Sequence, residues 1–299
     1  MSGRWARGWS MARASFAVLR RYPKLAVFPV ISGAILLLVG AVIAASLLPQ
    51  LGVLHISDAA QVWQKLGQNE TAQIWFYVAC FAGIYVLTAV AVFFNVALIR
   101  CALACHAGEE PSVRAGVAAA MTCLPQILGW ALVATTVGIA LNALEGMLKD
   151  KLGFLGSLVG GLFEFGWSIV TYFVLPVLAA ERVGPITAIR RSSAIVRSKW
   201  GESIVGEARF GLLGILFFLQ AALVFAAGLA LTLSHGATAF AGLGPLLMGI
   251  GVVYALVTLV VLQALGAIFQ AGLYVYATTG VVPPSLDRDL VEHAFRTKG

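Results

Sequence analysis

Six apolar runs, each about twenty residues or longer, constrain the fold of this chain more than any other feature. They cover residues 25–48, 73–99, 124–144, 153–180, 210–233 and 245–276. A helix needs about twenty apolar residues to cross the hydrocarbon core of a bilayer, because each residue adds about 1.5 Å along its axis. The chain is only 11% charged, against about 25% in soluble proteins. The sequence therefore predicts an all-α polytopic membrane protein with six transmembrane helices.

The basic residues predict how these spans are oriented. Of the 20 Lys and Arg residues, 17 fall in the N-terminal segment, the second and fourth connections and the C-terminal tail, all on one side of the spans. The other side holds only Lys65, Lys149 and Lys151. Because short loops rich in Lys and Arg remain in the cytoplasm, we expect both termini there. The net charge of +7 is then expected to meet anionic lipid headgroups, and no aromatic-interleaved basic patch argues for nucleic acid.

Short amphipathic helices are predicted at the cytoplasmic interface. Each inward-running span ends in a glycine that is followed within three residues by a proline. These pairs are Gly108/Pro111, Gly184/Pro185 and Gly280/Pro283. An interfacial helix precedes each outward-running span, so the unit of one interfacial helix plus one helical hairpin occurs three times.

A single membrane domain is expected over 1–299. It comprises an N-terminal amphipathic helix within 1–24, six spans within 25–277 and a cytoplasmic tail helix within 278–299. The basic helix after Gly184 is predicted to have a narrow apolar stripe, formed by Ile186, Ile189, Ser193, Val196 and Trp200. Pro176 is predicted to kink the fourth span.

The basic interfacial helices are the expected contacts for anionic lipid. Each Lys or Arg near an anionic surface contributes about 1 kcal/mol to binding. The residues concerned are Arg4, Arg20, Arg21, Arg190, Arg191, Arg197 and Lys199. These charges also set the topology of the spans, and the two roles are compatible.

The fourth span carries a stripe of small residues that predicts close helix packing. On a helix, residues three or four positions apart share one face. The stripe consists of Gly153, Gly156, Ser157, Gly160 and Thr171. Such faces let neighbouring membrane helices approach closely, so the stripe could also join two copies of the chain.

Glu164 lies in the middle of that stripe, at the centre of the apolar run. A carboxylate there costs about 2.5–3.5 kcal/mol on insertion scales and normally faces protein or water. Three interpretations stay open: a hydrogen-bonding group between helices, a proton- or cation-binding group in a pathway, and a contact with a partner subunit. Asn95, Asn142 and Gln270 are the polar residues expected to join it in either of the first two roles.

No metal, cofactor or enzyme chemistry is expected. Cys101 and Cys105 lie four residues apart beside His106, which is a ligand set that zinc could use, but the paired Cys-x-x-Cys spacing is missing. The chain also lacks the His-Glu-x-x-His, Gly-x-Ser-x-Gly and phosphate-binding glycine motifs.

Several short motifs resemble a family of uncharacterised bacterial six-span membrane proteins, known as a domain of unknown function. They are Arg20-Arg21-Tyr22-Pro23-Lys24-Leu25 with Phe28-Pro29, Gly184-Pro185-Ile186 with Ala188-Ile189-Arg190-Arg191-Ser192, Lys199-Trp200-Gly201-Glu202, and Tyr276-Ala277-Thr278-Thr279-Gly280. The resemblance implies a bacterial inner membrane and supplies no activity, cofactor or functional residue.

Two functions are therefore expected from the sequence. The first is a non-catalytic, oligomeric or scaffold membrane component that binds anionic lipid through its basic helices. The second is an ion channel or small-solute transporter whose pathway includes Glu164.

Overall fold

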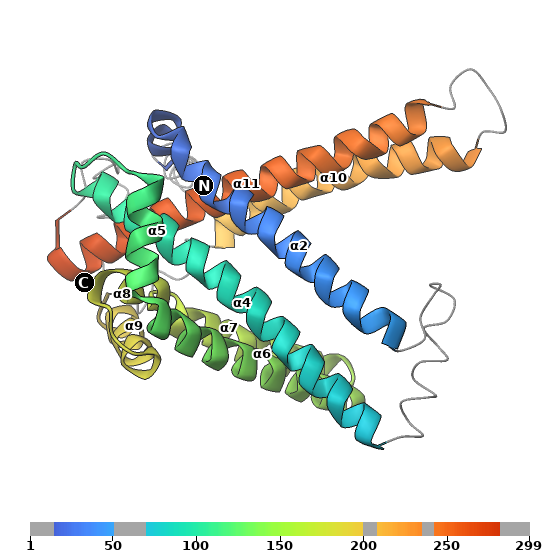
Figure 1. Cartoon of the computed structure of the whole chain (residues 1–299), viewed down its shortest axis with the longest axis horizontal. Helices are drawn as coiled ribbons and strands as arrows, with labels where there is room; N and C mark the ends of the chain where they lie inside the picture. The colour runs from blue at the N-terminus through green and yellow to red at the C-terminus, as the bar shows by residue number, and fades with distance from the viewer. Residues whose placement is uncertain (1–14, 51–69, 200–207, 235–241, 282–299) are drawn as a thin grey trace. The chain divides into compact units, whose positions relative to one another are not determined.

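The computed structural model describes residues 15–50, 70–199, 208–234 and 242–281, and the chain is helical through almost all of them (Figure 1). Within these ranges no strand is formed. Six helical stretches are long and apolar enough to cross a membrane, so the prediction of six spans is confirmed. They are Pro23–Ala45, Gln73–His106, Leu124–Leu152, Phe154–Glu181, Gly214–Leu233 and Leu243–Thr279. The protein is thus a multi-pass, all-α membrane protein.

The helices extend beyond the apolar runs that predicted them. After a helical segment at residues 15–21 come η1 (Pro23–Ala26), α2 (Val27–Gln50), α4 (Glu70–His106), α5 (Val113–Thr122), α6 (Leu124–Leu152), α7 (Phe154–Thr171), α8 (Val174–Glu181), α9 (Pro185–Lys199), α10 (Ala208–Ser234) and α11 (Leu243–Thr279). With 37 residues each, α4 and α11 exceed the roughly 30 Å hydrocarbon core, so their ends reach into the headgroup region. The predicted tail helix and the beginning of the N-terminal helix lie outside the described residues.

The repeated order of elements is present in the described chain. The short helix α5 precedes the α6–α7 hairpin, and α9 precedes the α10–α11 hairpin. Spans that lead back to a short helix or to the tail end in a left-handed residue: Gly108 after α4, Arg182 after α8 and Gly280 after α11. The prediction that Gly184 ends the second of these was wrong in detail, because the left-handed position is Arg182, two residues earlier.

The chain forms two compact units. The first consists of Met1–Pro29, Cys101–Val113 and Ile195–Gly299, and the second of Val30–Arg100 and Arg114–Ala194. In the first unit, η1 packs against α11, and Leu25 and Phe28 are almost fully buried. The second unit contains most of α2 and α4, together with α5, α6, α7, α8 and the first two thirds of α9.

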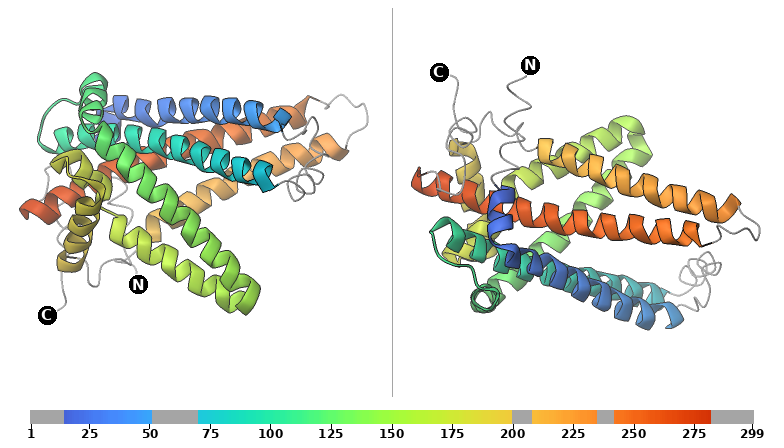
Figure 2. Two further views of the ribbon diagram at one scale, coloured as in Figure 1. Left: turned by 60° about the horizontal axis from the view of Figure 1, so that its bottom comes forward. Right: turned by 90° about the horizontal axis from the view of Figure 1, so that it is seen from above.

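In the first unit, α10 and α11 pack along a seam of small residues and lie side by side in every ribbon view (Figure 2). Seven residues are close to two helical turns, so positions seven apart share a face. The buried positions Gly214, Ala221 and Gly228 of α10 follow this spacing, as do Gly244, Gly251 and Thr258 of α11. A Cβ on Gly228 would lie 2.6 Å from the Met248 backbone nitrogen, so the two backbones are nearly in contact.

In the second unit, α6 and α7 form an antiparallel hairpin that turns at Gly153, which has a φ of 58°. A Cβ on Gly156 would overlap the carbonyl of Leu148, and one on Gly160 would lie 2.6 Å from Glu145 Cγ. Both glycines are buried. The predicted small-residue stripe is therefore a packing face, and α6 of the same chain fills it at these two positions.

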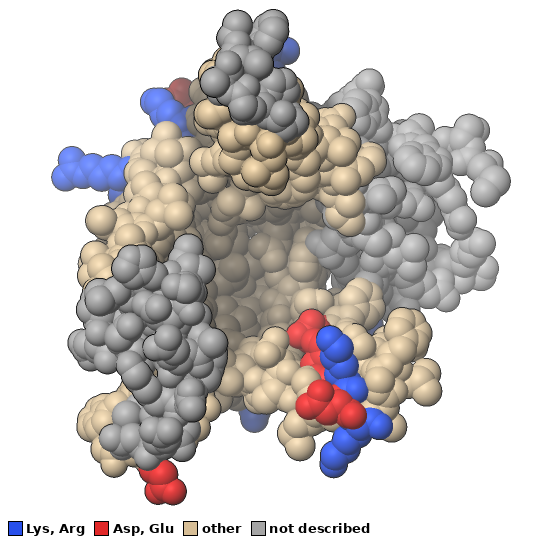
Figure 3. Space-filling view, turned by 90° about the vertical axis from the view of Figure 1, so that its right-hand side faces the viewer, with Lys and Arg blue, Asp and Glu red and all other residues tan. Residues whose placement is uncertain are grey.

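Most of the apolar surface of the spans is not buried inside the protein. In an apolar 18-residue stretch of each span, between 11% and 33% of the residues are buried. On the face drawn in Figure 3, side chains that are neither acidic nor basic cover most of the described surface, and the charged ones gather in a few places. A protein with an apolar surface of this extent would aggregate in water. Such a surface is typical of helices that contact lipid.

Candidate functional site

The fourth span is broken between α7 and α8, as Pro176 predicts. A proline has no N–H and its ring clashes with the carbonyl four residues earlier, which here belongs to Tyr172. Accordingly α7 ends at Thr171 and α8 begins at Val174. In an unbroken helix the Phe173 N–H and the Val170 carbonyl would each have a partner within the helix. Both groups lie at the break.

Ser192 of α9 forms hydrogen bonds with both of these groups. The Phe173 N–H donates to Ser192 Oγ over 3.0 Å, and the Ser192 hydroxyl donates to the Val170 carbonyl over 2.6 Å. The Ser192 side chain is fully buried. One hydroxyl thus bonds to both sides of the break and ties the basic helix α9 to it. We call this arrangement the Ser192 bridge.

Further contacts hold α8 and the start of α9 in place. Arg100 of α4 donates from Nη1 to the Ala179 carbonyl over 2.9 Å. Arg191 Nε pairs with Glu181 Oε1 at 3.2 Å. A Cβ on Gly129 of α6 would lie 3.0 Å from Pro185 Cγ, so α6 touches the first residue of α9 closely. The basic helix is therefore held by contacts to α6, α7 and α8, and α8 is in turn held by α4.

These contacts decide which face of α9 is exposed. The buried side chains are Ala188, Ser192 and Ile195, at four- and three-residue spacing. Of the predicted apolar stripe, Ile189, Ser193 and Val196 are half-buried, whereas Ile186 is 57% exposed. It shares the outer face with Arg190 and Arg197, which are both exposed. An apolar side chain flanked by arginines on one exposed face suits the headgroup region of a bilayer.

Arg182 is strained, which leads to a testable prediction. It is the one non-glycine residue of the described chain with a positive φ, at 54°. Its carbonyl accepts a hydrogen bond from Gln126 Nε2 at 3.3 Å. A left-handed conformation costs an ordinary residue about 1 kcal/mol relative to glycine.

We expect Arg182→Gly to raise the free energy of unfolding by up to about 1 kcal/mol in detergent thermal denaturation. Arg182→Ala, which removes the charge but keeps the strain, should give no such gain; a gain of equal size in both variants would point to charge instead.

The residues predicted to contact anionic lipid fall into three groups. Arg20, Arg21, Arg190 and Arg197 are exposed, and the Arg21 guanidinium lies 5.5 Å from the centre of the Tyr22 ring. The side chain of Arg191 is 55% exposed and is paired with Glu181. Arg4 and the side chain of Lys199 lie outside the described residues.

The polar residues predicted to cluster around Glu164 belong to different units. Gln270 is half-buried in the first unit, whereas Asn95, Asn142 and Glu164 belong to the second. Asn95 Nδ2 donates to the Ala91 carbonyl of its own helix over 3.0 Å. Asn142 and Glu164 are exposed, and neither makes a hydrogen bond or ion pair with a described residue. Of the four, then, Asn142 and Glu164 share one hairpin.

Near the end of α4, the side chains of Cys101 and His106 contact backbone carbonyls. The Cys101 Sγ donates to the Ser112 carbonyl over 3.3 Å, and His106 Nε2 lies 3.0 Å from the Ile268 carbonyl of α11. Both residues are buried in the first unit. Across the described ranges, no three His, Cys, Asp or Glu side chains come together as a metal site would require.

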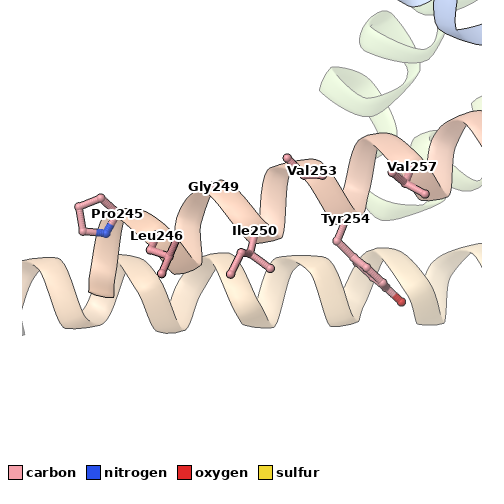
Figure 4. A pocket seen from close by; sticks show the side chains of 7 residues that line it. All are labelled: Pro245, Leu246, Gly249, Ile250, Val253, Tyr254 and Val257. Carbon is pink, nitrogen blue, oxygen red and sulfur yellow. The ribbon is translucent and has the colours of Figure 1, made fainter. Parts of the chain in front are cut away.

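A shallow apolar groove of about 600 Å³ runs along α11 (Figure 4). Its lining comes from α11 alone: Pro245, Leu246, Gly249, Ile250, Val253, Tyr254 and Val257. Tyr254 turns its ring toward α10, where its hydroxyl donates to Gln220 Oε1 over 2.8 Å. The groove therefore has the chemistry of a hydrocarbon-facing surface and offers no charged group to a ligand.

Two features of the structure, one in each unit, escaped sequence reasoning. The Ser192 bridge could not be predicted from the sequence. A serine on a basic helix is expected to be exposed, and nothing in the sequence around Ser192 indicates that its hydroxyl is buried. The α10–α11 seam did leave a signal, namely small residues seven positions apart in two consecutive apolar runs.

The sequence was compared with known proteins. A family model described as a family of unknown function (DUF6159) matches residues 74–283, which are 210 of the 299 residues. The comparisons with curated proteins and with solved structures found no match.

Proposed function

Since the chain belongs to a family of unknown function, we propose a role from its own surface: a non-catalytic membrane component whose basic helices bind anionic lipid headgroups. The observation that carries this proposal is the fixed orientation of α9, which exposes Arg190 and Arg197 while Arg191 is engaged with Glu181. A helix anchored in this way need not lose much side-chain or backbone freedom when it binds headgroups.

The proposal includes an orientation. The end of the spans that carries α9 and residues 15–21 would face the cytoplasm of a bacterial cell, at its inner membrane, because 17 of the 20 basic residues lie on that side. Phosphate groups of anionic lipids are concentrated on that surface, and each nearby arginine contributes about 1 kcal/mol to their binding. Arg20 and Arg21 would add to the same interaction from the N-terminal segment.

The experiment measures the lipid preference of the reconstituted full chain. Spin-labelled phosphatidylglycerol and phosphatidylcholine are compared in vesicles, and the wild type should bind the anionic lipid more tightly at the protein surface. We expect Arg190→Gln and Arg197→Gln to lower the relative association constant by about fivefold each, as about 1 kcal/mol per arginine implies. Raising the salt concentration should weaken the wild-type preference, because exposed charges are screened.

The matched control is Arg191→Gln on the same helix. Its charge is already paired at 3.2 Å with Glu181, so its loss should change the lipid preference less than the loss of either neighbour. Equal effects of the three substitutions would mean that only the net charge of the helix matters. An unchanged preference in the Arg190 and Arg197 variants would contradict the proposal.

A further inference from the structure

The α6–α7 hairpin carries two polar side chains at the same depth in the membrane. Asn142 lies ten residues before the end of α6 at Leu152, and Glu164 lies ten residues after the start of α7 at Phe154. At 1.5 Å per residue, both are about 15 Å from the turn of the hairpin, which is half the thickness of the hydrocarbon core.

The two side chains also share one flank of the hairpin. The Ser157 hydroxyl donates to Glu145 Oε1 over 3.4 Å, so these residues lie on the same side of the α6–α7 seam. Glu164 follows Ser157 by seven residues, which returns it to that side two turns deeper. Asn142 precedes Glu145 by three residues and lies one turn deeper. We call this side the polar flank.

On the polar flank, Asn142 and Glu164 are exposed, and the described chain does not satisfy their polar groups. Asn142 and Glu164 make no hydrogen bond with any described residue. Polar groups that face lipid at this depth are costly, and in membrane proteins they normally contact protein or water. Two glycines, Gly161 and Gly138, also lie on this flank, and a Cβ on either would meet nothing within 4 Å. Neighbouring helices approach most closely at such small residues.

We infer that the polar flank binds the same flank of a second copy of this chain. No Lys or Arg lies between residues 124 and 148 or between 154 and 181, so the pairing would rest on hydrogen bonds and not on an ion pair. A two-fold axis along the membrane normal keeps depth unchanged, so it brings Asn142 of one copy level with Glu164 of the other, twice. An amide donor and a carboxyl acceptor at equal depth are what such an isologous interface needs.

The first test introduces one additional cysteine at a time and measures cross-linking of the variants in vesicles of neutral lipid. Gly161→Cys lies on the polar flank, three residues before Glu164. Gly166→Cys is the matched control, because its position is equally open but lies two residues beyond Glu164, on the other side of α7. Oxidation should convert the first variant to a covalent dimer and leave the second at the level of the wild type, which carries the four native cysteines.

The second test measures dimerisation by energy transfer between labelled copies at increasing dilution in lipid. Asn142→Ala and Glu164→Leu should each weaken dimerisation about tenfold, because each removes a pair of reciprocal hydrogen bonds. Glu164→Gln keeps an acceptor oxygen and should dimerise like the wild type. If Gly161→Cys does not fold, Gly138→Cys probes the same flank from α6.

Three results would overturn the inference. They are a chain that is monomeric at every dilution, a dimer that the Asn142 and Glu164 substitutions leave unchanged, and cross-linking at Gly166 instead of Gly161. A monomer in which Glu164→Gln abolishes a proton flux would make the flank the wall of a pathway. Because the lipid is neutral, these results do not depend on the binding of anionic headgroups.

Discussion

Replacing Gly156 with alanine is expected to destabilise the protein, although the change adds only one methyl group. A Cβ at this position would overlap the backbone carbonyl of Leu148 on α6, and a backbone cannot move aside as a flexible side chain can. The two helices must separate, at a cost of about 2–3 kcal/mol, which is typical of an overpacked contact. Thermal unfolding of the purified protein in detergent measures the loss.

Gly166→Ala is the matched control for this prediction. It lies on the same helix, and its Cβ would meet nothing within 4 Å. Alanine favours a helix over glycine by up to about 1 kcal/mol, so this variant should unfold at the wild-type temperature or slightly above it. Equal melting temperatures for the Gly156 and Gly166 variants would show that the α6–α7 contact is not as close as described.

Ser192→Ala is expected to have a larger effect, because it removes the Ser192 bridge. The Phe173 N–H and the Val170 carbonyl then both lose their hydrogen bond to Ser192 beside the proline break. The loss of a buried hydrogen-bond partner costs about 1–3 kcal/mol, so the free energy of unfolding should fall by about 2–5 kcal/mol. Amide hydrogen exchange at Phe173 should become faster, which distinguishes the loss of this bridge from general destabilisation.

Ser193→Ala tests whether the effect belongs to the bridge. Ser193 is adjacent on the same basic helix, but its hydroxyl only donates back to the Arg190 carbonyl over 2.9 Å. We expect a change within about 0.5 kcal/mol and no faster exchange at Phe173. The assignment of the bridge fails if the two serine variants behave alike.

Apolar length and proline chemistry predicted the spans and the break in the fourth one. Both are local properties: about twenty apolar residues suffice to cross a bilayer, and Pro176 cannot continue a helix from the turn before it. The packing face of α7 was predictable for a similar reason, since Gly156 and Gly160 share a face by spacing alone.

The faces that depend on distant partners were not predictable. The register of α9 is set by Ser192, whose two partners lie 19 and 22 residues earlier in the chain. Arg182 occupies a position where sequence rules favour glycine, and they pointed to Gly184 nearby. A membrane helix is apolar on its buried face and on its lipid-facing side, so the hydrophobicity of α10 and α11 shows little periodicity. The spacing of small residues was the remaining indication of the buried face.

The seven-residue spacing of the α10–α11 seam has a mechanical consequence. A contact that recurs every seven residues falls slightly short of two full turns of a straight α-helix, so the helices must coil around each other with a left-handed twist to stay in contact. The axes of α10 and α11 can come closer than the usual 8–10 Å, because Gly228, Gly244 and Gly251 have no side chains. Interlocked backbones of this kind resist both sliding and splaying, so we expect the hairpin to tilt in the bilayer as one stiff rod.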